Sequence, residues 1–451
     1  MQPEVLVGHE LRLAAEDGRD AAGVARVWFG AGGSAAPARA GAGPAAPGLR
    51  ELAGRLLAEL AELPAEPALA AAEPDSWAAV TRTWPAGPPP AAPPEPDGPA
   101  PGGLRARLEA AWTGRAVGCV LGKPVEKLPL EGIRALARAA GNWPLDDWFT
   151  ARGVPPALLA AYPWNRRSAA TSLAENIDGA PEDDDLDYPL LNLLLLRRHG
   201  RGFATADVAR LWLEELPAGR TFTAERAAYR NLLLGLEPPA TAVHHNPFRE
   251  WIGALIRADV HGWTNPGDPA AAAAQAHRDA ALTHTRNGLY AALFAAAAIA
   301  EAASGRADVH TALRAGLAVV PPGSRLAEAV RFGIRAAHDD EADFDRVVDR
   351  LHARYGHYHW VHAVPNTALI AAALTHADGD FTRSVCRAVS GGWDTDSNGA
   401  TAGSLAALVA GRVPDRWRAP LKNRLATCIA GFDGIGFDTL AQLTAQEAAR
   451  S

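Results

Sequence analysis

The sequence predicts an all-α protein. Helical periodicity recurs along the chain from Leu104 onward, and no segment of similar length alternates apolar and polar residues with period two. The apolar fraction is 48%, but aromatic residues contribute only 7%, a composition that favours closely packed helices. A chain of 451 residues exceeds the size at which a single core stops growing, so we expect one large helical domain with a smaller appendage.

A proline-rich segment separates these two parts. In residues 85–103, PAGPPPAAPPEPDGPAPGG, the prolines fix φ and remove hydrogen-bond donors, which predicts a semi-rigid linker. Residues 1–84 are then an accessory region of unknown role that we expect to fold separately. It contains a strand or helix over residues 4–13, a low-complexity stretch over 30–48, and one helix over 48–63 with leucines at helical spacing, Leu52, Leu56, Leu57 and Leu60.

The remaining residues, 104–451, form the predicted main domain. Helices are expected over residues 104–122, 187–200, 203–216, 223–236, 287–305 and 366–377. Thr205 is expected to cap the helix over 203–216. Gly305 is expected to end the alanine-rich helix over 287–305. Helix on helix is the packing that this pattern favours.

Charge and cysteine content exclude several classes of protein. A net charge of −7 and a pI near 6.1 exclude a broad basic surface, so no nucleic-acid partner is expected. Three widely spaced cysteines, Cys119, Cys386 and Cys428, support neither a disulfide framework nor a cysteine zinc site. The acidic N-terminus does not resemble a signal peptide, and the longest apolar run, 291–300, is too short for a bilayer. We therefore expect a cytoplasmic protein with no membrane association and reduced thiols; the sequence does not indicate its oligomeric state.

Two acidic clusters stand out, PEDDDLDYP at 181–189 and GGWDTDSNGATAG at 391–403. Adjacent carboxylates repel one another unless they face water, cap a helix or neutralise a cation. A solvated helix N-terminus is the simpler interpretation of an isolated DDD. However, the first cluster runs directly into the apolar LLNLLLL, and the second into the small-residue segment ATAGSLAALVAG, so both lie at the start of predicted core helices.

These clusters offer the ligands that Mg²⁺ prefers. Carboxylates, supplemented by hydroxyls and waters, are the usual ligands of hard cations. The candidate ligands carry too much negative charge for one divalent ion and a reasonable charge for two; they are Asp183, Asp184, Asp185, Asp394, Asp396 and Ser397.

Five segments of the chain form an ordered set: GRAVGCVLGKPVEKLP, SLAENIDGAPEDDDLDY, the run from IGALIRAD to FAAAAIAEA, VHAVPNTALIAAAL and GGWDTDSNGATAGSLAALVAG. Together, and in this order, they resemble the ADP-ribosylglycohydrolase family. The resemblance covers residues 104–448, and the ordered combination is far more specific than any one segment. It implies an orthogonal multi-helix bundle of the ADP-ribosylglycohydrolase type, with two Mg²⁺ ions, or Mn²⁺ in their place, between the acidic clusters.

The resemblance also implies roles for individual residues. The family's first metal-binding element falls on Asp183, Asp184 and Asp185, with aspartate where many relatives have threonine, and the second falls on Asp394, Asp396 and Ser397. The catalytic candidates are Glu126, Asp184 and Asp396, and Glu126 is the acid/base candidate. Two alternatives remain open. Glu126 could be an ordinary surface glutamate in a loop, and the alignment with the family's first metal-binding element could be shifted by one residue, a register in which Glu182, Asp183 and Asp184 are the ligands. We prefer the first register because Tyr188 then occupies the family's apolar position.

The middle of the chain supplies the expected substrate pocket, formed by Gly253, Arg257, His284, Asn287, Gly288 and Tyr290. Arg257 could bind a diphosphate through its fork of donors, or equally be a buried ion-pair partner of Asp259 or another acid. His284 is assigned to ligand contact and not to catalysis.

The resemblance implies a Mg²⁺-dependent glycohydrolase that removes ADP-ribose from a modified protein or small molecule. One alternative keeps the metal site but acts on a small N-riboside or another sugar conjugate, because the motifs do not identify the leaving group. Another is an inactive ADP-ribose-binding protein. A zinc site at His357, His359 and His362 is not favoured, because no HExxH arrangement is present.

Overall fold

The computed structural model describes residues 1–35, 47–85 and 103–450. Within these ranges the protein has 24 α-helices and five short 3-10 helices, and only isolated β-bridges in place of strands. The predicted all-α fold is confirmed. Most of the expected linker and the centre of the low-complexity stretch lie outside the described residues.

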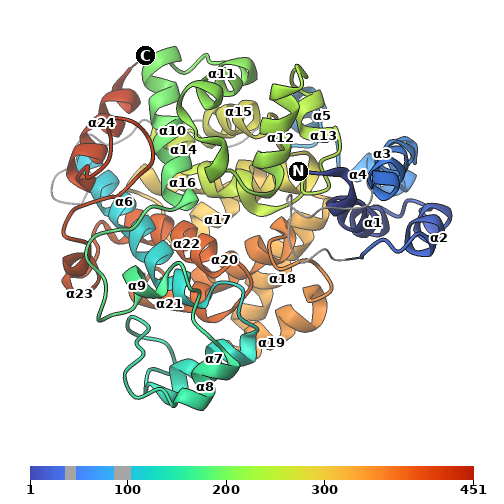
Figure 1. The fold of residues 1–451 in the computed structure, drawn as a ribbon. Coiled ribbons are helices and arrows are strands. Elements are labelled where there is room, and N and C mark those ends of the chain that lie inside the picture. The colour runs from blue at the N-terminus through green and yellow to red at the C-terminus, as the bar shows by residue number, and fades with distance from the viewer. Residues whose placement is uncertain (36–46, 86–102, 451) are drawn as a thin grey trace.

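The N-terminal region is helical throughout its described part, including residues 4–13, where the sequence left a strand open. Its elements are η1 (Pro3–Val5), α1 (Val7–Glu16), α2 (Ala22–Gly30), α3 (Pro47–Glu62), α4 (Pro67–Ala72) and α5 (Trp77–Arg82). In α3, Leu56, Leu57 and Leu60 are buried, as their spacing predicts. Figure 1 shows α1 to α4 gathered on one side of the main body.

Two helices, α6 (Gly103–Gly122) and α22 (Thr395–Ala410), pack against each other in the centre of the body (Figure 1). They touch through glycines: a Cβ on Gly118 would lie 1.8 Å from the carbonyl oxygen of Gly399, and one on Gly114 would lie 2.4 Å from that of Gly403. At the next turn Gly122 meets Thr395, whose hydroxyl donates to the Gly122 carbonyl at 2.8 Å. The helices are therefore antiparallel, and the last turn of α6 lies beside the first turn of α22.

The other helices surround this pair. The elements between α6 and the long buried helix α16 (Arg286–Ala303) are η2 (Lys123–Val125), α7 (Leu130–Ala139), α8 (Pro156–Ala161), α9 (Ala169–Ser172), α10 (Asp184–His199), α11 (Thr205–Glu215), η3 (Ala218–Arg220), α12 (Thr223–Leu233), α13 (Ala240–Val243), η4 (Ile252–Arg257), α14 (Asp259–Trp263) and α15 (Pro269–Ala280). After α16 come α17 (Val309–Ala318), α18 (Arg325–Asp339), α19 (Phe344–Tyr355), α20 (Ala363–Ala377), α21 (Phe381–Ser390), α23 (Asp415–Arg418), η5 (Ala419–Leu421) and α24 (Phe437–Ala449).

The ends of the predicted helices lie within three residues of the observed ends, but one predicted cap is wrong. Gly305 follows the end of α16 with φ +78°, a conformation that favours glycine. The prediction that Thr205 caps α11 is wrong, because Thr205 is the first helical residue and its hydroxyl donates to the Arg278 carbonyl. The carboxylate of Asp207 instead accepts the Ala204 backbone N–H at 2.8 Å. Threonine is a common capping residue, but the hydroxyl of Thr205 makes its hydrogen bond to a residue distant in sequence and is not available for the cap.

The N-terminal region does not stand apart from the rest of the chain. Its apolar residues belong to the same buried cluster as those of the main helices. Its acids also enter a buried ionic network: Glu10 pairs with Arg249, Asp17 with Arg286, and Glu73 with Arg286 and Arg325. The described N-terminal residues therefore share an interior with the main helices, and their separate folding stays a prediction.

No described helix combines the length and apolar character needed to cross a bilayer.

Candidate active site

The first acidic cluster forms the start of α10. Asp183 is the N-cap, and its Oδ1 accepts the backbone N–H of Asp185 at 3.0 Å. Pro189 lies inside this helix and has no N–H to donate to the carbonyl of Asp185, four residues earlier. The Nε of Arg115, on α6, donates to that carbonyl at 2.6 Å. A helical proline thus leaves a backbone acceptor that anchors α10 to α6.

The second cluster forms the start of α22 and follows a turn with left-handed backbone. Gly392 has φ +80° and Trp393 φ +57°, an uncommon conformation for a tryptophan. The Trp393 ring stacks on His352 at 4.0 Å between centroids, which holds the turn in place. Asn366, on α20, accepts the backbone N–H of Asp394 at 3.1 Å and the side-chain amide of Asn398 at 2.8 Å. These contacts fix the backbone of Asp394 and thereby restrict the positions that its carboxylate can take.

The two clusters, about 210 residues apart in sequence, meet in space. The hydroxyl of Ser397 donates to Asp185 at 3.1 Å. One ligand atom from each of Glu126, Asp394 and Asp396 lies within 4.8 Å of the others. The glycine contact of α6 with α22 explains this arrangement. It places the end of α6, and with it Glu126 directly after η2, beside the first turn of α22.

Fixed cations neutralise some of these carboxylates and leave others unpaired. Lys123 pairs with Asp183, Arg115 with Asp185 at 3.3 Å, and Lys127 with Glu126 at 2.7 Å. Among the described residues, no ion pair reaches the other three carboxylates, those of Asp184, Asp394 and Asp396. Part of the cluster is thus an uncompensated concentration of negative charge.

This charge raises the pKa values of the group. Burial, together with Glu126 and Asp183 nearby, raises the pKa of Asp396 to about 7. Burial and Asp396 raise the pKa of Asp394, and burial with the flanking aspartates raises that of Asp184. Carboxylates that resist ionisation in this way are stabilised in the charged form by a bound cation.

The ADP-ribosylglycohydrolase profile matches residues 100–449, more than three quarters of the chain. The chain belongs to the ADP-ribosylglycohydrolase family. One similar solved structure is an ADP-ribosylglycohydrolase-related protein complex, with 22% identity, a TM-score of 0.45, and coverage of 76% of this chain and 99% of that chain. No match was found among curated proteins.

Membership in the ADP-ribosylglycohydrolase family makes this chain a glycohydrolase, and the acidic residues fit the metal dependence that is general in the family. The donor set consists of carboxylates and one serine hydroxyl, which suits a hard divalent cation. Asp394 and Asp396 are buried and lack the positive partner that buried carboxylates require, and the half-buried Asp184 has no ion-pair partner among the described residues either. Glu126 is not a surface residue in a loop: only 17% of its side chain is exposed, and Asn165 donates to it at 2.7 Å.

Glu182, the residue of the alternative register, faces elsewhere. It pairs with Arg220 at 2.9 Å, and its carboxylate gathers with Asp187 and Cys428 instead of with the second cluster. This placement favours the register that begins at Asp183.

The predicted substrate residues form two buried groups. In the first, Arg257 is fully buried, and its donors are used by Asp279 at 2.9 Å and Glu225 at 3.0 Å. This is the ion-pair alternative, with partners other than Asp259, which pairs with Arg115. Arg257 therefore has no donors aimed at a diphosphate in this conformation.

Gly253 and His284 lie in the same group. A Cβ on Gly253 would lie 2.1 Å from Oε1 of Glu225, so any other residue there would have to displace that carboxylate. His284 is buried, its Nδ1 lies 2.6 Å from the Thr283 hydroxyl, and burial holds its pKa well below the usual range. This histidine is neutral at physiological pH.

The second group contacts the N-terminal region. The Asn287 amide donates to Glu73 at 2.9 Å and to Glu250 at 2.7 Å, and the Tyr290 hydroxyl donates to the Pro74 carbonyl at 2.5 Å. Gly288 is packed against the Arg249 carbonyl. The ligand-binding role of all six residues stays a prediction.

The three histidines of the disfavoured zinc site lie against aromatic rings. His359 stacks on Trp251 at 4.1 Å, and His357 lies beside Tyr358. The Nδ1 of His362 accepts the Val364 backbone N–H as a helix cap.

Sequence reasoning missed Arg115, Lys123 and Asn366. All three lie in segments quoted for the family resemblance, but nothing in their spacing shows which carboxylate each one contacts. The available signal was chemical: a buried acidic cluster needs positive partners, and Arg115 on α6 and Lys123 on η2 are the basic residues that most closely precede Glu126.

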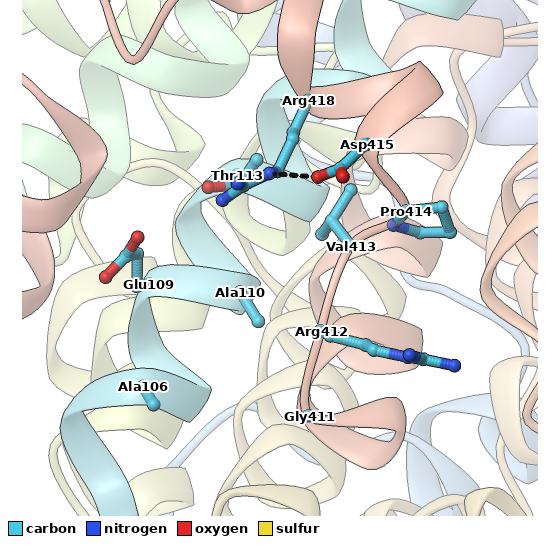
Figure 2. A pocket seen from close by; sticks show the side chains of 10 residues that line it. All are labelled: Ala106, Glu109, Ala110, Thr113, Gly411, Arg412, Val413, Pro414, Asp415 and Arg418. Carbon is cyan, nitrogen blue, oxygen red and sulfur yellow. Dashed lines mark hydrogen bonds and ion pairs between the residues drawn. The ribbon is translucent and has the colours of Figure 1, made fainter. Parts of the chain in front are cut away.

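A cavity of about 490 Å³ lies elsewhere, between the N-terminal half of α6 and the segment that leads into α23 (Figure 2). It is lined by Glu109, Thr113, Arg412 and the Asp415–Arg418 ion pair, among others. None of the predicted catalytic or metal residues lines it, so we do not place the active site there.

Proposed function

We propose that this protein hydrolyses the bond between the anomeric carbon of ADP-ribose and an acceptor, using two Mg²⁺ ions, or Mn²⁺ in their place. The observation that carries the proposal is the meeting of Asp394 and Asp396 with Glu126, and of Ser397 with Asp185, with no ion pair to Asp394 or Asp396 among the described residues. We further propose that the substrate is a protein or small molecule that carries ADP-ribose, and that hydrolysis releases the ADP-ribose from it.

The ligands proposed for the ions are Asp183, Asp184, Asp185, Asp394, Asp396 and Ser397. When bound, the ions supply positive charge that orients the ribose and acidifies a water molecule. The protein's own part is to hold the carboxylates at fixed positions. Asn366 fixes the backbone of Asp394, and Arg115 fixes that of Asp185.

Glu126 is the proposed acid/base residue. Cleavage at ribose passes through an oxocarbenium-like transition state, which requires a group that holds or releases a proton at the leaving atom or the water. Glu126 lies beside Asp394 and Asp396, keeps part of its side chain open to solvent, and is oriented by Asn165 and Lys127.

The test is an activity assay on ADP-ribosyl-arginine, ADP-ribosyl-serine and simple nucleosides, with Mg²⁺ and with a chelator. We expect hydrolysis of at least one ADP-ribosyl conjugate, lost with the chelator and in Asp394→Ala. Glu126→Gln should lower kcat while leaving the Mg²⁺-dependent rise in Tm in place. Glu182→Gln, in the same acidic run but paired with Arg220, is the matched control and should remain active.

Two other outcomes would reject the proposal. Cleavage of nucleosides alone would indicate the small-riboside alternative. Binding of Mg²⁺ and ADP-ribose with no hydrolysis of any conjugate would indicate a binding protein.

A further inference from the structure

A lysine side chain occupies one side of the acidic cluster. Lys123 is the first residue of η2, directly after α6, and its Nζ pairs with Asp183 Oδ2 and lies 3.5 Å from the Glu182 carbonyl. Only 10% of the side chain is exposed. The other oxygen of Asp183 caps α10. Both oxygens of this proposed ligand are therefore already in use.

The cluster consequently has two unlike sides. On the first side, Asp183 and Asp185 carry fixed cations, and the thiol of Cys119 completes a group whose ligand atoms lie within 4.8 Å of one another. On the second side, Asp394 and Asp396 carry none, and they gather with Glu126, whose partner Lys127 has 60% of its side chain exposed. A divalent ion therefore meets a buried competing ammonium on the first side and only an exposed, solvent-screened one on the second.

The two fixed cations of the first side are held very differently. Arg115 is fully buried and donates to the Asp185 backbone, to the Ile256 carbonyl and to Asp259, so it cannot leave. Lys123 has only Asp183 and one carbonyl, and its ammonium stands on a flexible four-carbon stem. Lys123 is the one that an incoming ion can displace.

We propose that Lys123 makes the two Mg²⁺ positions unequal: the side of Glu126, Asp394 and Asp396 takes its ion directly, and the side of Asp183 and Asp185 takes one only after displacing the ammonium. The inference rests on the proposed metal centre. It gives Lys123 a positioning role, and it predicts that occupancy of the second ion, and not of the first, follows the free Mg²⁺ concentration.

The test is calorimetric titration of the full-length, metal-free chain with Mg²⁺. For the wild type we expect two binding events of different affinity. In Lys123→Met the weaker event should tighten by about tenfold or more, because the unit charge that pairs with Asp183 is gone. The tighter event should tighten less, because Lys123 acts on Asp396 only through space. Lys123→Arg keeps the charge and should not tighten the weaker event.

Controls separate this effect from a general change in charge. Lys422→Met removes a lysine that pairs with Asp178 and has 61% of its own side chain exposed. This substitution should leave both affinities unchanged. Should Lys123→Met fail to fold, Lys123→Gln and the dependence of Tm on Mg²⁺ provide the same comparison. Circular dichroism of each variant verifies folding.

Unchanged affinity of the weaker event in Lys123→Met, or two equal events in the wild type, would overturn the inference and leave the metal centre standing. A chain that binds two unequal ions but hydrolyses no ADP-ribosyl conjugate would support the inference and reject the proposed function. Absence of Mg²⁺ binding in every variant would overturn both.

Discussion

Replacing Glu73 by glutamine should destabilise the whole protein, although this residue lies outside the family match. The Glu73 side chain is fully buried, and its carboxylate accepts from Arg325 at 2.8 Å and from Asn287 at 2.9 Å, with Arg286 also at 2.9 Å. The substitution keeps the shape of the side chain but removes its charge, so that two buried guanidinium groups lose a shared counter-charge.

The contacts of Glu73 determine how much free energy of unfolding the substitution removes. Removing one partner of a buried ion pair costs about 3–5 kcal/mol. We take about 3 kcal/mol, the low end of that range, because Asp17 and Glu250 remain within reach of both arginines. Burial would raise the pKa of Glu250, but Arg325 and Arg286 lower it to about 2, so Glu250 stays charged and continues to compensate them. With about 2.1 cal/mol/K of unfolding entropy per residue, the loss lowers the Tm of a 451-residue chain by about 3 °C.

Differential scanning calorimetry of the metal-free protein measures this change. The matched control is Glu51→Gln, which breaks an exposed pair with Arg55 on α3 and should not change Tm measurably. Equal effects of the two substitutions, or no fall in Tm for Glu73→Gln, would refute the view that the N-terminal region is stabilised through buried charge.

Three further predictions concern the acidic cluster and the helices that form it. Mg²⁺ at 100 times its Kd should stabilise the wild type by about 2.7 kcal/mol, seen as a rise in Tm, and Asp394→Ala should abolish that rise; a rise that persists would remove Asp394 from the ligands. The folded-state pKa of Asp396 is raised to about 7, so its contribution to metal-free stability is present at low pH and lost as pH rises from the unfolded value towards 7. The rise in Tm with Mg²⁺ should therefore be larger at pH 8 than at pH 6, and equal rises by scanning fluorimetry would contradict this. Gly118→Ala places a Cβ 1.8 Å from the Gly399 carbonyl and should cost about 1–3 kcal/mol in denaturant unfolding and weaken Mg²⁺ binding, whereas Gly54→Ala, with open space in α3, should not destabilise.

Much of the fold follows from local pattern. The helices expected from apolar periodicity are present, and the small-residue segment after Asp394 packs closely against α6 as its composition indicates. Both of these features depend on residues that are neighbours in sequence, so spacing is sufficient to predict them. The meeting of the two aspartate clusters was expected from the family resemblance and not from spacing, because about 210 residues separate them.

Contacts between distant residues could not be predicted in this way. Arg115 reaches Asp185 and Asp259 across 70 and 144 residues, and no spacing rule selects those partners. Glu73 likewise lies in a segment without any motif, and its partner Arg325 is 252 residues away. Chemistry shows that a buried charge needs a partner, but only the folded chain identifies which one.

The buried acids of the N-terminal region affect where the chain can be cut for expression. The family match starts at residue 100, and a fragment that starts there lacks Glu10, Asp17 and Glu73. Arg249, Arg286 and Arg325 would then be exposed with Glu250 as the remaining acid paired with Arg286 and Arg325, which leaves a basic surface on a protein that is otherwise acidic. Such a fragment should bind polyanions and aggregate at low ionic strength, a property that belongs to the truncation and not to the intact protein.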